Sequence, residues 1–205
     1  CICSRFPDGK IISMDLSQVE LRVAGLLSGD EAFINAYQHG EDLHAQRAHQ
    51  VFEGHNSDME WNDKRQAAKM VNFADLFRSG ANNELISKAE QVGKIELPFT
   101  GQSRYFLGGE KYEINEIVNF PVQTSASNTL IQIQTYIHKH MPSLNSPNTS
   151  IHMFLNIYDA IYFDVKNEIA EQEIRQIVTD AVNYVQNEGY WAMLSDYYGN
   201  EIPLE

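Results

Sequence analysis

Two aspartates that are far apart in the sequence occupy positions where a metal-dependent reaction could use them. Asp15 follows the apolar segment 11–14, which predicts a strand, and precedes a Ser17-Gln18 turn and a helix. A sheet holds a carboxylate at a strand end rigidly, and the following loop leaves room for substrate, so this position suits a metal ligand. Asp and Ser are also common helix caps, and this stretch alone fits a capping role for Asp15 equally well.

The second aspartate, Asp159, lies between two apolar segments, 151–157 and 161–165, which predict strands that meet at Tyr158-Asp159-Ala160. Aspartate is also a frequent turn residue, and that is the alternative interpretation. If an antiparallel sheet brings both strand ends together, the two carboxylates can share magnesium. Hard cations that keep several waters need few carboxylates, and the backbone carbonyl of Leu16 is a plausible third ligand.

A predicted helix over residues 62–78 carries a third set of candidates. Arg65, Lys69, Phe73 and Phe77 recur every four residues and therefore form one stripe along the helix. Two cations followed by two aromatic rings suit a nucleoside triphosphate, with the cations on the phosphates and a ring near the sugar and base. The alternative is an ordinary amphipathic helix with solvated Lys and Arg side chains.

The elements that position these residues are mainly helices, as the periodicity of apolar residues predicts. Asp-Gly at 8–9 predicts a turn into the first strand, and Pro98 to Gly101 predicts the turn of a hairpin over 94–106. Pro121 is expected to kink or restart a long helix. The other predicted helices span 19–27, 30–38, 43–52, 112–140, 168–187 and 190–196.

Composition restricts the class of protein. The 205 residues are 43% hydrophobic, enough for a proper core, and no apolar run is long enough to cross a bilayer. Two cysteines, Cys1 and Cys3, favour a reducing intracellular setting. The formal net charge of −13 argues against nucleic acid as a partner, although Lys64, Arg65 and Lys69 cluster on one helix. The acidic excess is concentrated near the C-terminus.

Four segments resemble motifs of the family A (polymerase I-like) DNA polymerases, in the family's order. DLSQVELRV, from Asp15, is similar to the first catalytic motif. RQAAKMVNFADLF, from Arg65, is similar to the motif on the mobile fingers helix. NFPVQTSASN, from Asn119, resembles a segment that reaches the primer-template minor groove, and Tyr-Asp-Ala at 158–160 stands where the family usually has His-Asp-Glu.

The resemblance implies an α+β fold, a polymerase palm with a small antiparallel sheet backed by helices and a helical fingers subdomain, without a thumb. Residues 1–29 would form the first part of the palm, 30–111 the fingers, and 112–205 the second part of the palm. Relatives carry a longer helical excursion after the fingers helix, so the fingers look shortened after residue 80, with a deletion or a gap near 80–83. The missing thumb, and an exonuclease domain, would belong to the same polymerase.

The resemblance also implies roles for residues. Asp15, Leu16 and Asp159 would bind two Mg²⁺ ions, for which Mn²⁺ can substitute, and Lys69 would join the two aspartates in catalysis. A further set would bind the incoming dNTP: Gln18, Glu20, His44, Arg65, Lys69, Phe73 and Phe77. Primer-template DNA would contact Arg22, Asn119, Gln123 and Tyr158. The protein would be of phage or bacterial type and act in the cytoplasm of the bacterium or infected host, with no membrane contact.

The sequence departs from the family at positions that matter. Phe77 stands where the family has a tyrosine whose hydroxyl holds Glu20, so we expect this chain to reject ribonucleotides less strictly. A Phe77→Tyr variant should reject them more strictly in a single-nucleotide incorporation assay. Ala160 removes a carboxylate. The Tyr-Asp-Ala motif, the shortened fingers and the acidic charge favour the alternative of a catalytically weakened or inactive polymerase-like module that binds DNA or another partner. A two-metal nuclease is a further alternative, because two aspartates do not by themselves specify the reaction.

Overall fold

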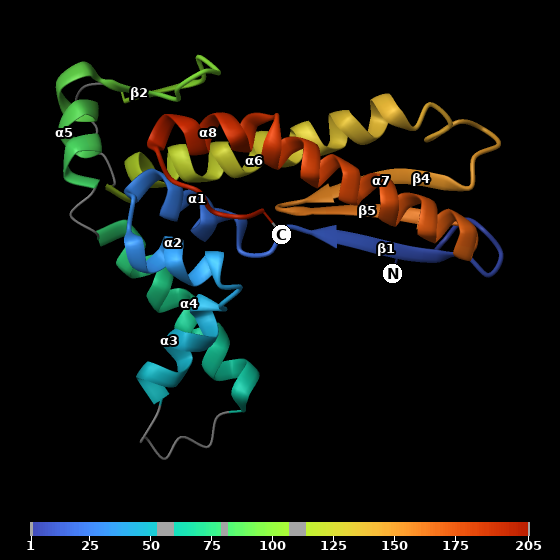
Figure 1. The fold of residues 1–205 in the computed structure, drawn as a ribbon, viewed down its shortest axis with the longest axis horizontal. Helices are drawn as coiled ribbons and strands as arrows, with labels where there is room; N and C mark the ends of the chain where they lie inside the picture. The colour runs from blue at the N-terminus through green and yellow to red at the C-terminus, as the bar shows by residue number, and fades with distance from the viewer. Residues whose placement is uncertain (1, 53–59, 79–81, 107–113, 205) are drawn as a thin grey trace. The chain divides into compact units, whose positions relative to one another are not determined.

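The computed structural model describes residues 2–52, 60–78, 82–106 and 114–204, and the chain forms two compact units (Figure 1). The first unit comprises Cys1–Val19 and Ser125–Glu205, and the second comprises Glu20–Thr124. Small antiparallel sheets combine with helices in an α+β fold, as the sequence predicts. None of the helices in these described ranges is long and apolar enough to cross a membrane.

A three-stranded antiparallel sheet is the centre of the first unit. Strands β1 (Lys10–Asp15), β4 (Ile151–Ile157) and β5 (Ala160–Val165) lie in the order β1-β5-β4. β4 and β5 are consecutive and form a hairpin, whereas β1 comes from the start of the chain and pairs with β5 along its whole length. The sheet therefore joins two segments separated by more than a hundred residues.

The two faces of β5 differ, as alternation along a strand requires. Ile161, Phe163 and Val165 are buried, and so are Ile174 and Ala181 on helix α7 (Glu168–Asn187). Figure 1 shows α7 lying along the sheet. These apolar side chains pack on the face of the sheet that α7 covers, and the alternate residues of β5 lie on the opposite face.

Helices and the C-terminal segment complete the first unit. Helix α6 (Ile114–His140) contributes residues to both units and is buried here at Ile133 and Ile137. Helix α8 (Tyr190–Tyr198) buries Trp191, whose indole Nε1 donates to the backbone oxygen of Ile202 at 2.7 Å. A buried indole N–H needs such a partner, so this contact fixes the end of the chain on the unit.

The second unit is mainly helical. It contains α1 (Val19–Ser28), α2 (Glu31–Gln38), α3 (Leu43–Phe52), α4 (Trp61–Arg78) and α5 (Asn82–Val92). A short hairpin, β2 (Lys94–Glu96) and β3 (Ser103–Tyr105), follows α5. α3 and α4 pack against each other, as Figure 1 also shows. A separate hydrophobic cluster forms around Ala89, Ile95, Phe106 and Ile117.

The predicted elements agree closely with the structure, with two exceptions. Helix α5 is an element that the sequence analysis did not predict, in a stretch where it found only a connection. Of the two effects predicted for Pro121, a kink or a restart of the long helix, the restart does not occur, because α6 continues through Pro121. A proline removes only one backbone donor, and its neighbours along α6, including Val122 and Val118, are buried, so packing holds the helix together.

Two other predictions concern parts of the chain that are not described. Of the expected deletion or gap near 80–83, residues 80 and 81 lie outside the described residues, whereas 82 and 83 belong to α5. The expected helix start at residue 112 falls in 107–113 and also lies outside the described residues.

Candidate active site

The first unit brings Asp15 and Asp159 together. In the pairing of β1 with β5, Asp15 lies opposite Ala160, the residue after Asp159. The backbone N–H of Leu16 also donates to the backbone oxygen of Asp159 at 3.3 Å, which fixes the hairpin against the end of β1. Asp15 is exposed and Asp159 is half-buried. One carboxylate at the end of β1 and another in the adjoining β4–β5 turn, both at least partly exposed, can bind a cation without a large desolvation cost.

The position of Asp15 in the structure excludes one of its two interpretations, the helix cap. It is the last residue of β1, paired in the ladder, and α1 begins only at Val19. Gln18, not Asp15, is the residue before the helix. Asp15 therefore does not occupy the capping position, and the ladder holds it as the terminal residue of a strand.

Backbone strain is present beside both aspartates. Gln18 and Tyr158 have φ values of 53° and 54°, in the left-handed region that non-glycine residues rarely adopt. Each such conformation costs roughly 1 kcal/mol. Tyr158 stands at the first position of the two-residue turn between Ile157 and Ala160, and its side chain is 94% exposed. Strained residues concentrate at functional sites, so the strained backbone of Gln18 and Tyr158 supports a functional role for the surface around Asp15 and Asp159.

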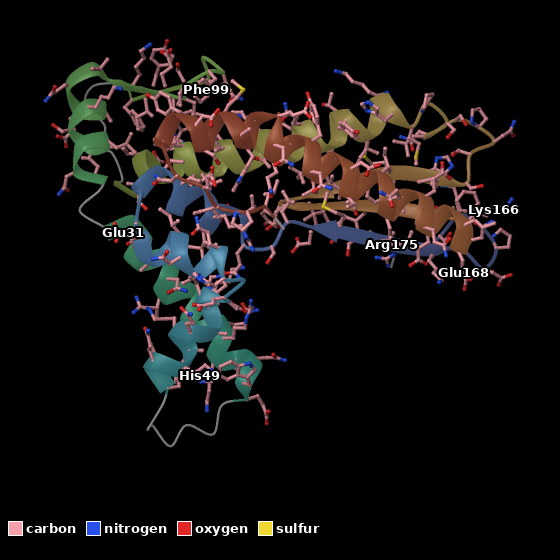
Figure 2. All side chains as sticks on the ribbon, in the orientation of Figure 1. Glu31, His49, Phe99, Lys166, Glu168 and Arg175 are labelled. Atoms are coloured by element: carbon pink, nitrogen blue, oxygen red, sulfur yellow. The ribbon has the colours of Figure 1, made fainter. Side chains whose placement is uncertain are left out.

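A cavity of about 320 Å³ lies beside β1. Asp15, Phe163 and Arg175 are among its lining residues, so the cavity is bordered by β1, β5 and α7. Arg175, labelled on α7 in Figure 2, donates to Glu171 at 2.8 Å, and Lys10 at the start of β1 contacts the same carboxylate at 3.2 Å. Hydrogen bonds from Arg175 and then Lys10 hold the pKa of Glu171 below its usual value. These contacts attach the start of β1 to α7.

Asp164 is a buried carboxylate that the sequence analysis missed. Its residue is only 3% exposed, on the face of β5 opposite Phe163. It accepts hydrogen bonds from the Ser4 hydroxyl, from the Arg5 backbone N–H at 3.0 Å and from Arg5 Nε at 3.1 Å. Burial alone would raise its pKa, but these three donors outweigh burial and hold the pKa below its usual value. A charged residue inside an otherwise apolar strand was the sequence signal for it.

The second unit places the predicted cations of α4 beside the start of α3. Arg65 contacts one carboxylate oxygen of Asp42 through both Nε and Nη2, each at 2.8 Å. Asp42 also accepts from the backbone N–H groups of His44 at 2.9 Å and Ala45 at 3.2 Å, in the manner of a helix cap. Burial raises the pKa of Asp42, yet the hydrogen bond from Arg65 and those from the backbone lower it by more. Arg65 is thus oriented by a carboxylate that is itself fixed to a helix end.

His44 is nearly completely buried, with 2% of its surface exposed. Its Nδ1 lies 3.0 Å from the side-chain nitrogen of Asn72 on α4, and the same nitrogen lies 3.1 Å from the backbone oxygen of Leu43. The net effect of its surroundings lowers the pKa of His44 to about 4: burial is the largest cause, the charge of Asp42 opposes it, and the charges of Arg65 and Lys69 add to it. His44 is therefore neutral at pH 7.

The sequence analysis gave no role to two residues of this network. Asp42 could have been found from its position two residues before His44 at a helix start, where aspartate caps. Asn72 could have been noticed as a polar residue inside a helix, although no spacing rule links it to His44. Further along the same helices, the ring of His49, labelled in Figure 2, lies 4.6 Å from that of Trp61, between ring centroids.

Other predicted residues of the second unit have distinct environments. Arg22 is 2% exposed, and its guanidinium lies 4.5 Å from the centroid of the Tyr37 ring. This conformation gives Arg22 a packing role, and it does not support the predicted DNA contact. Lys69 and Gln123 are exposed, whereas Glu20 and Asn119 are half-buried. The side chains of Phe73 and Phe77 lie outside the described part of the chain.

The residues at the end of β1 fit a hard divalent cation by their chemistry. Two carboxylates and a backbone carbonyl supply oxygen ligands, which Mg²⁺ prefers, and the cation can keep several waters as further ligands. Among the described residues there is no group of three or more His, Cys, Asp and Glu side chains arranged around one point. A metal here would therefore depend on Asp15, Asp159, the backbone carbonyl of Leu16 and non-protein oxygens.

Comparisons with known proteins identify a family. Residues 3–96 match the model of DNA polymerase family A. The chain is 31% identical over 152 residues to DNA polymerase I of Lactococcus lactis subsp. lactis (strain IL1403), and 31% identical over 154 residues to that of Geobacillus stearothermophilus. Each match covers 72% of this chain and 16% of the relative. The thermostable DNA polymerase I of Thermus thermophilus is 42% identical over 72 residues, which are 35% of this chain and 8% of the relative.

A solved structure shares the fold. The POL domain of Pol1 from M. smegmatis, in complex with DNA primer-template and dNTP, superposes with a TM-score of 0.68 at 18% identity, over 95% of this chain and 38% of that one. The fold is thus that of a family A polymerase domain. The chain belongs to DNA polymerase family A. It spans about 16% of the length of the curated relatives it matches, so their full activity is not transferred to it by similarity alone.

Proposed function

We propose that this chain carries the palm and fingers of a template-directed DNA polymerase, which adds dNMP to a primer 3′-hydroxyl and releases pyrophosphate. Residues 1–29 and 112–205 would form the palm, and 30–111 the fingers. The observation that carries the proposal is the junction of Asp15 and Asp159 at the end of the β1–β5 ladder. Membership of the family and the motif order along the chain support it.

Phosphoryl transfer asks little covalent chemistry of a protein, because in-line geometry and neutralisation of charge dominate. Asp15 and Asp159, with the carbonyl of Leu16, would hold two Mg²⁺ ions. When bound, such ions supply charge neutralisation at the primer hydroxyl and at the leaving pyrophosphate. The bond from the primer oxygen to the α-phosphorus forms as the α–β phosphoanhydride bond breaks, and the hydroxyl proton passes to solvent.

The remaining residues bind and orient the nucleotide and the DNA. Arg65 and Lys69 would neutralise the triphosphate, with Arg65 presented by its pairing to Asp42. His44 would add a hydrogen bond to a phosphate, and Glu20 would exclude a 2′-hydroxyl. The other assignments rest on the resemblance: Gln18, Phe73 and Phe77 at the nucleotide, and Asn119, Gln123 and Tyr158 at primer-template DNA. The described conformation offers no support for Arg22 at DNA.

The test is single-dNTP incorporation on a primed template with Mg²⁺. Asp159→Asn removes one anionic ligand, so we expect primer extension to fall on the order of a thousandfold. The matched control is Asp196→Asn, an exposed aspartate on α8, which should extend as the unaltered chain does.

The same gel separates the alternatives. Absence of extension by the unaltered chain and by both variants would contradict the proposal. It would favour a polymerase-like module that binds DNA or another partner without polymerising, which the loss of a carboxylate at Ala160 would suit. Primer shortening that disappears in Asp159→Asn would instead establish a two-metal nuclease.

A further inference from the structure

The start of α3 is joined to α4 by one side-chain amide. Asn72 on α4 is 8% exposed, and its nitrogen lies 3.1 Å from the backbone oxygen of Leu43 and 3.0 Å from Nδ1 of His44. Leu43 and His44 are the first two residues of α3. A single amide therefore contacts both the backbone and the side chain of this helix start.

The chemistry of these atoms fixes the direction of both hydrogen bonds. An amide nitrogen only donates, and it has two hydrogens, while a backbone carbonyl oxygen only accepts. The contact with Leu43 therefore requires the nitrogen end of the Asn72 amide to face α3. The second hydrogen of that nitrogen is directed to Nδ1 of His44, which must then be an acceptor. A neutral imidazole that accepts at Nδ1 carries its proton on Nε2.

The surroundings of His44 favour the neutral ring. It is buried, and the cations Arg65 and Lys69 face it from α4, while Asp42, at the start of its own helix, is the opposing charge. Asp42 is itself neutralised by the ion pair with Arg65. Burial and the two cations place the pKa of His44 at about 4, so a third positive charge at this helix start is disfavoured.

We propose that Asn72 is a positioning residue for the triphosphate site, which holds His44 as the neutral tautomer with its proton on Nε2, so that the ring can donate to a phosphate oxygen of the incoming nucleotide. This inference rests on the proposed function, which places a triphosphate beside His44, Arg65 and Lys69. Asn72 would act only through His44. Its amide has no hydrogen left for a nucleotide once both are donated to α3.

The arrangement gives the two sides of the site separate supports. Asp42 orients Arg65, and Asn72 orients His44, and both act at the first turn of α3. Lys69 attracts phosphate without fixing its position, because its ammonium is a compact point charge on a flexible stem. A neutral donor with a fixed proton adds direction, and it adds no repulsion between cations when the nucleotide is absent.

Histidine ring ¹⁵N spectra test the tautomer without any nucleotide. His44→Gln assigns the signal of His44 among the seven histidines. We expect an unprotonated Nδ1 and a protonated Nε2 at pH 7, unchanged down to pH 5. In Asn72→Asp, a carboxylate oxygen can only accept from the ring, so the His44 pKa should rise toward its ordinary value of about 6.5 or above. Asn62→Asp, exposed on the same helix, is the control and should leave the His44 signal unchanged.

Steady-state kinetics test the link to the nucleotide. Asn72→Ala should raise KM for dNTP about fivefold with kcat within twofold, as expected for the loss of one oriented hydrogen bond in ground-state binding. In a His44→Gln background the same change should add nothing further, because the two residues act through one contact. Asn62→Ala should leave both constants unchanged.

The outcomes separate this inference from the proposed function. A protonated Nδ1 in the unaltered chain at pH 7, or a His44 pKa that does not respond to Asn72→Asp, overturns the inference even if the chain polymerises. Lower thermal stability of Asn72→Ala without a change in KM also overturns it, because the role is then only structural. If the unaltered chain does not extend a primer, the proposed function fails, and with it the nucleotide link, whereas the spectra still decide the role of Asn72 toward His44.

Discussion

At the scale of single residues, the polar side chains with the best-defined partners are those that hold others in place. Asp164 accepts three hydrogen bonds from residues 4 and 5, and on β4 its cross-strand neighbour His152 stacks on Phe6, with 5.7 Å between ring centroids. The first residues of the chain are thus fixed over the sheet that carries Asp15 at the end of β1 and Asp159 in the β4–β5 turn. A buried carboxylate without these donors would be costly, so Asp164 and the N-terminal segment depend on each other.

Replacing Asp164 with Asn should reduce the free energy of unfolding by about 2 kcal/mol, because a charged acceptor of three hydrogen bonds is lost and its amide cannot accept from all three donors. Arg5 is half exposed, which keeps the ion-pair part of this loss small. Urea unfolding at pH 7 measures the change. Asp196→Asn on the surface serves as the control and should change stability by less than about 0.5 kcal/mol.

The pH dependence of stability gives a second test of Asp164. Its pKa is lower in the folded chain than in the unfolded chain, where it is about 3.9. The stability it contributes is therefore fully present above that value and is lost as the pH falls through the lower, folded pKa. Urea midpoints measured from pH 6 to pH 2 should fall less steeply for Asp164→Asn than for the unaltered chain below pH 4. Parallel curves would show that Asp164 is not a linked group.

At the scale of elements, the start of α3 depends on one carboxylate with two functions. Asp42 caps the helix through the N–H groups of His44 and Ala45, and it holds Arg65 of α4. A cap acts within one element, whereas the ion pair connects two elements that pack together. One carboxylate therefore stabilises α3 through Oδ1 and orients the first cation of the α4 stripe through Oδ2.

Two substitutions of Asp42 separate these functions. Asp42→Ala removes the cap and the ion pair and should reduce the free energy of unfolding by about 1–2 kcal/mol. Asp42→Asn keeps an oxygen that can cap but loses the charge, so most stability should remain while Arg65 is released. Thermal unfolding measures the first effect, and KM for dNTP measures the second. Equal stability of the two variants would contradict a capping role.

At the scale of the whole molecule, charge opposes the proposed partner. The net charge is −13, because 28 acidic residues outweigh 15 Lys and Arg residues, so the chain as a whole repels a DNA backbone. The 205-residue chain should bind primer-template DNA weakly, with two to three phosphates neutralised and a slope of about −2 to −3 in log K against log salt. Fluorescence anisotropy between 50 and 200 mM salt measures this slope. A slope near −8 would show a basic surface that the charge count does not reveal.

The sequence by itself determined the elements and the ends of strands. Periodicity, glycines and prolines are local signals, so the helices of the second unit other than α5, the β4–β5 hairpin and the strand before Asp15 could be predicted from residues close in the chain. The resemblance to DNA polymerases likewise depended on short motifs. Helix α5 was missed because residues 79–93 were taken as a connection, although Leu85, Ile86 and Ala89 have helical spacing and meet in one hydrophobic cluster in the folded chain.

Only the tertiary structure decided which side chains support the candidate residues. Arg65 pairs with Asp42 over 23 positions, His44 with Asn72 over 28, and Arg5 with Asp164 over 159. No periodicity links residues at such separations, because each pair meets only when two elements pack or a sheet closes. The sequence therefore named the groups that could do the chemistry, and packing determined the charge state of His44, the orientation of Arg65 and the junction of Asp15 with Asp159.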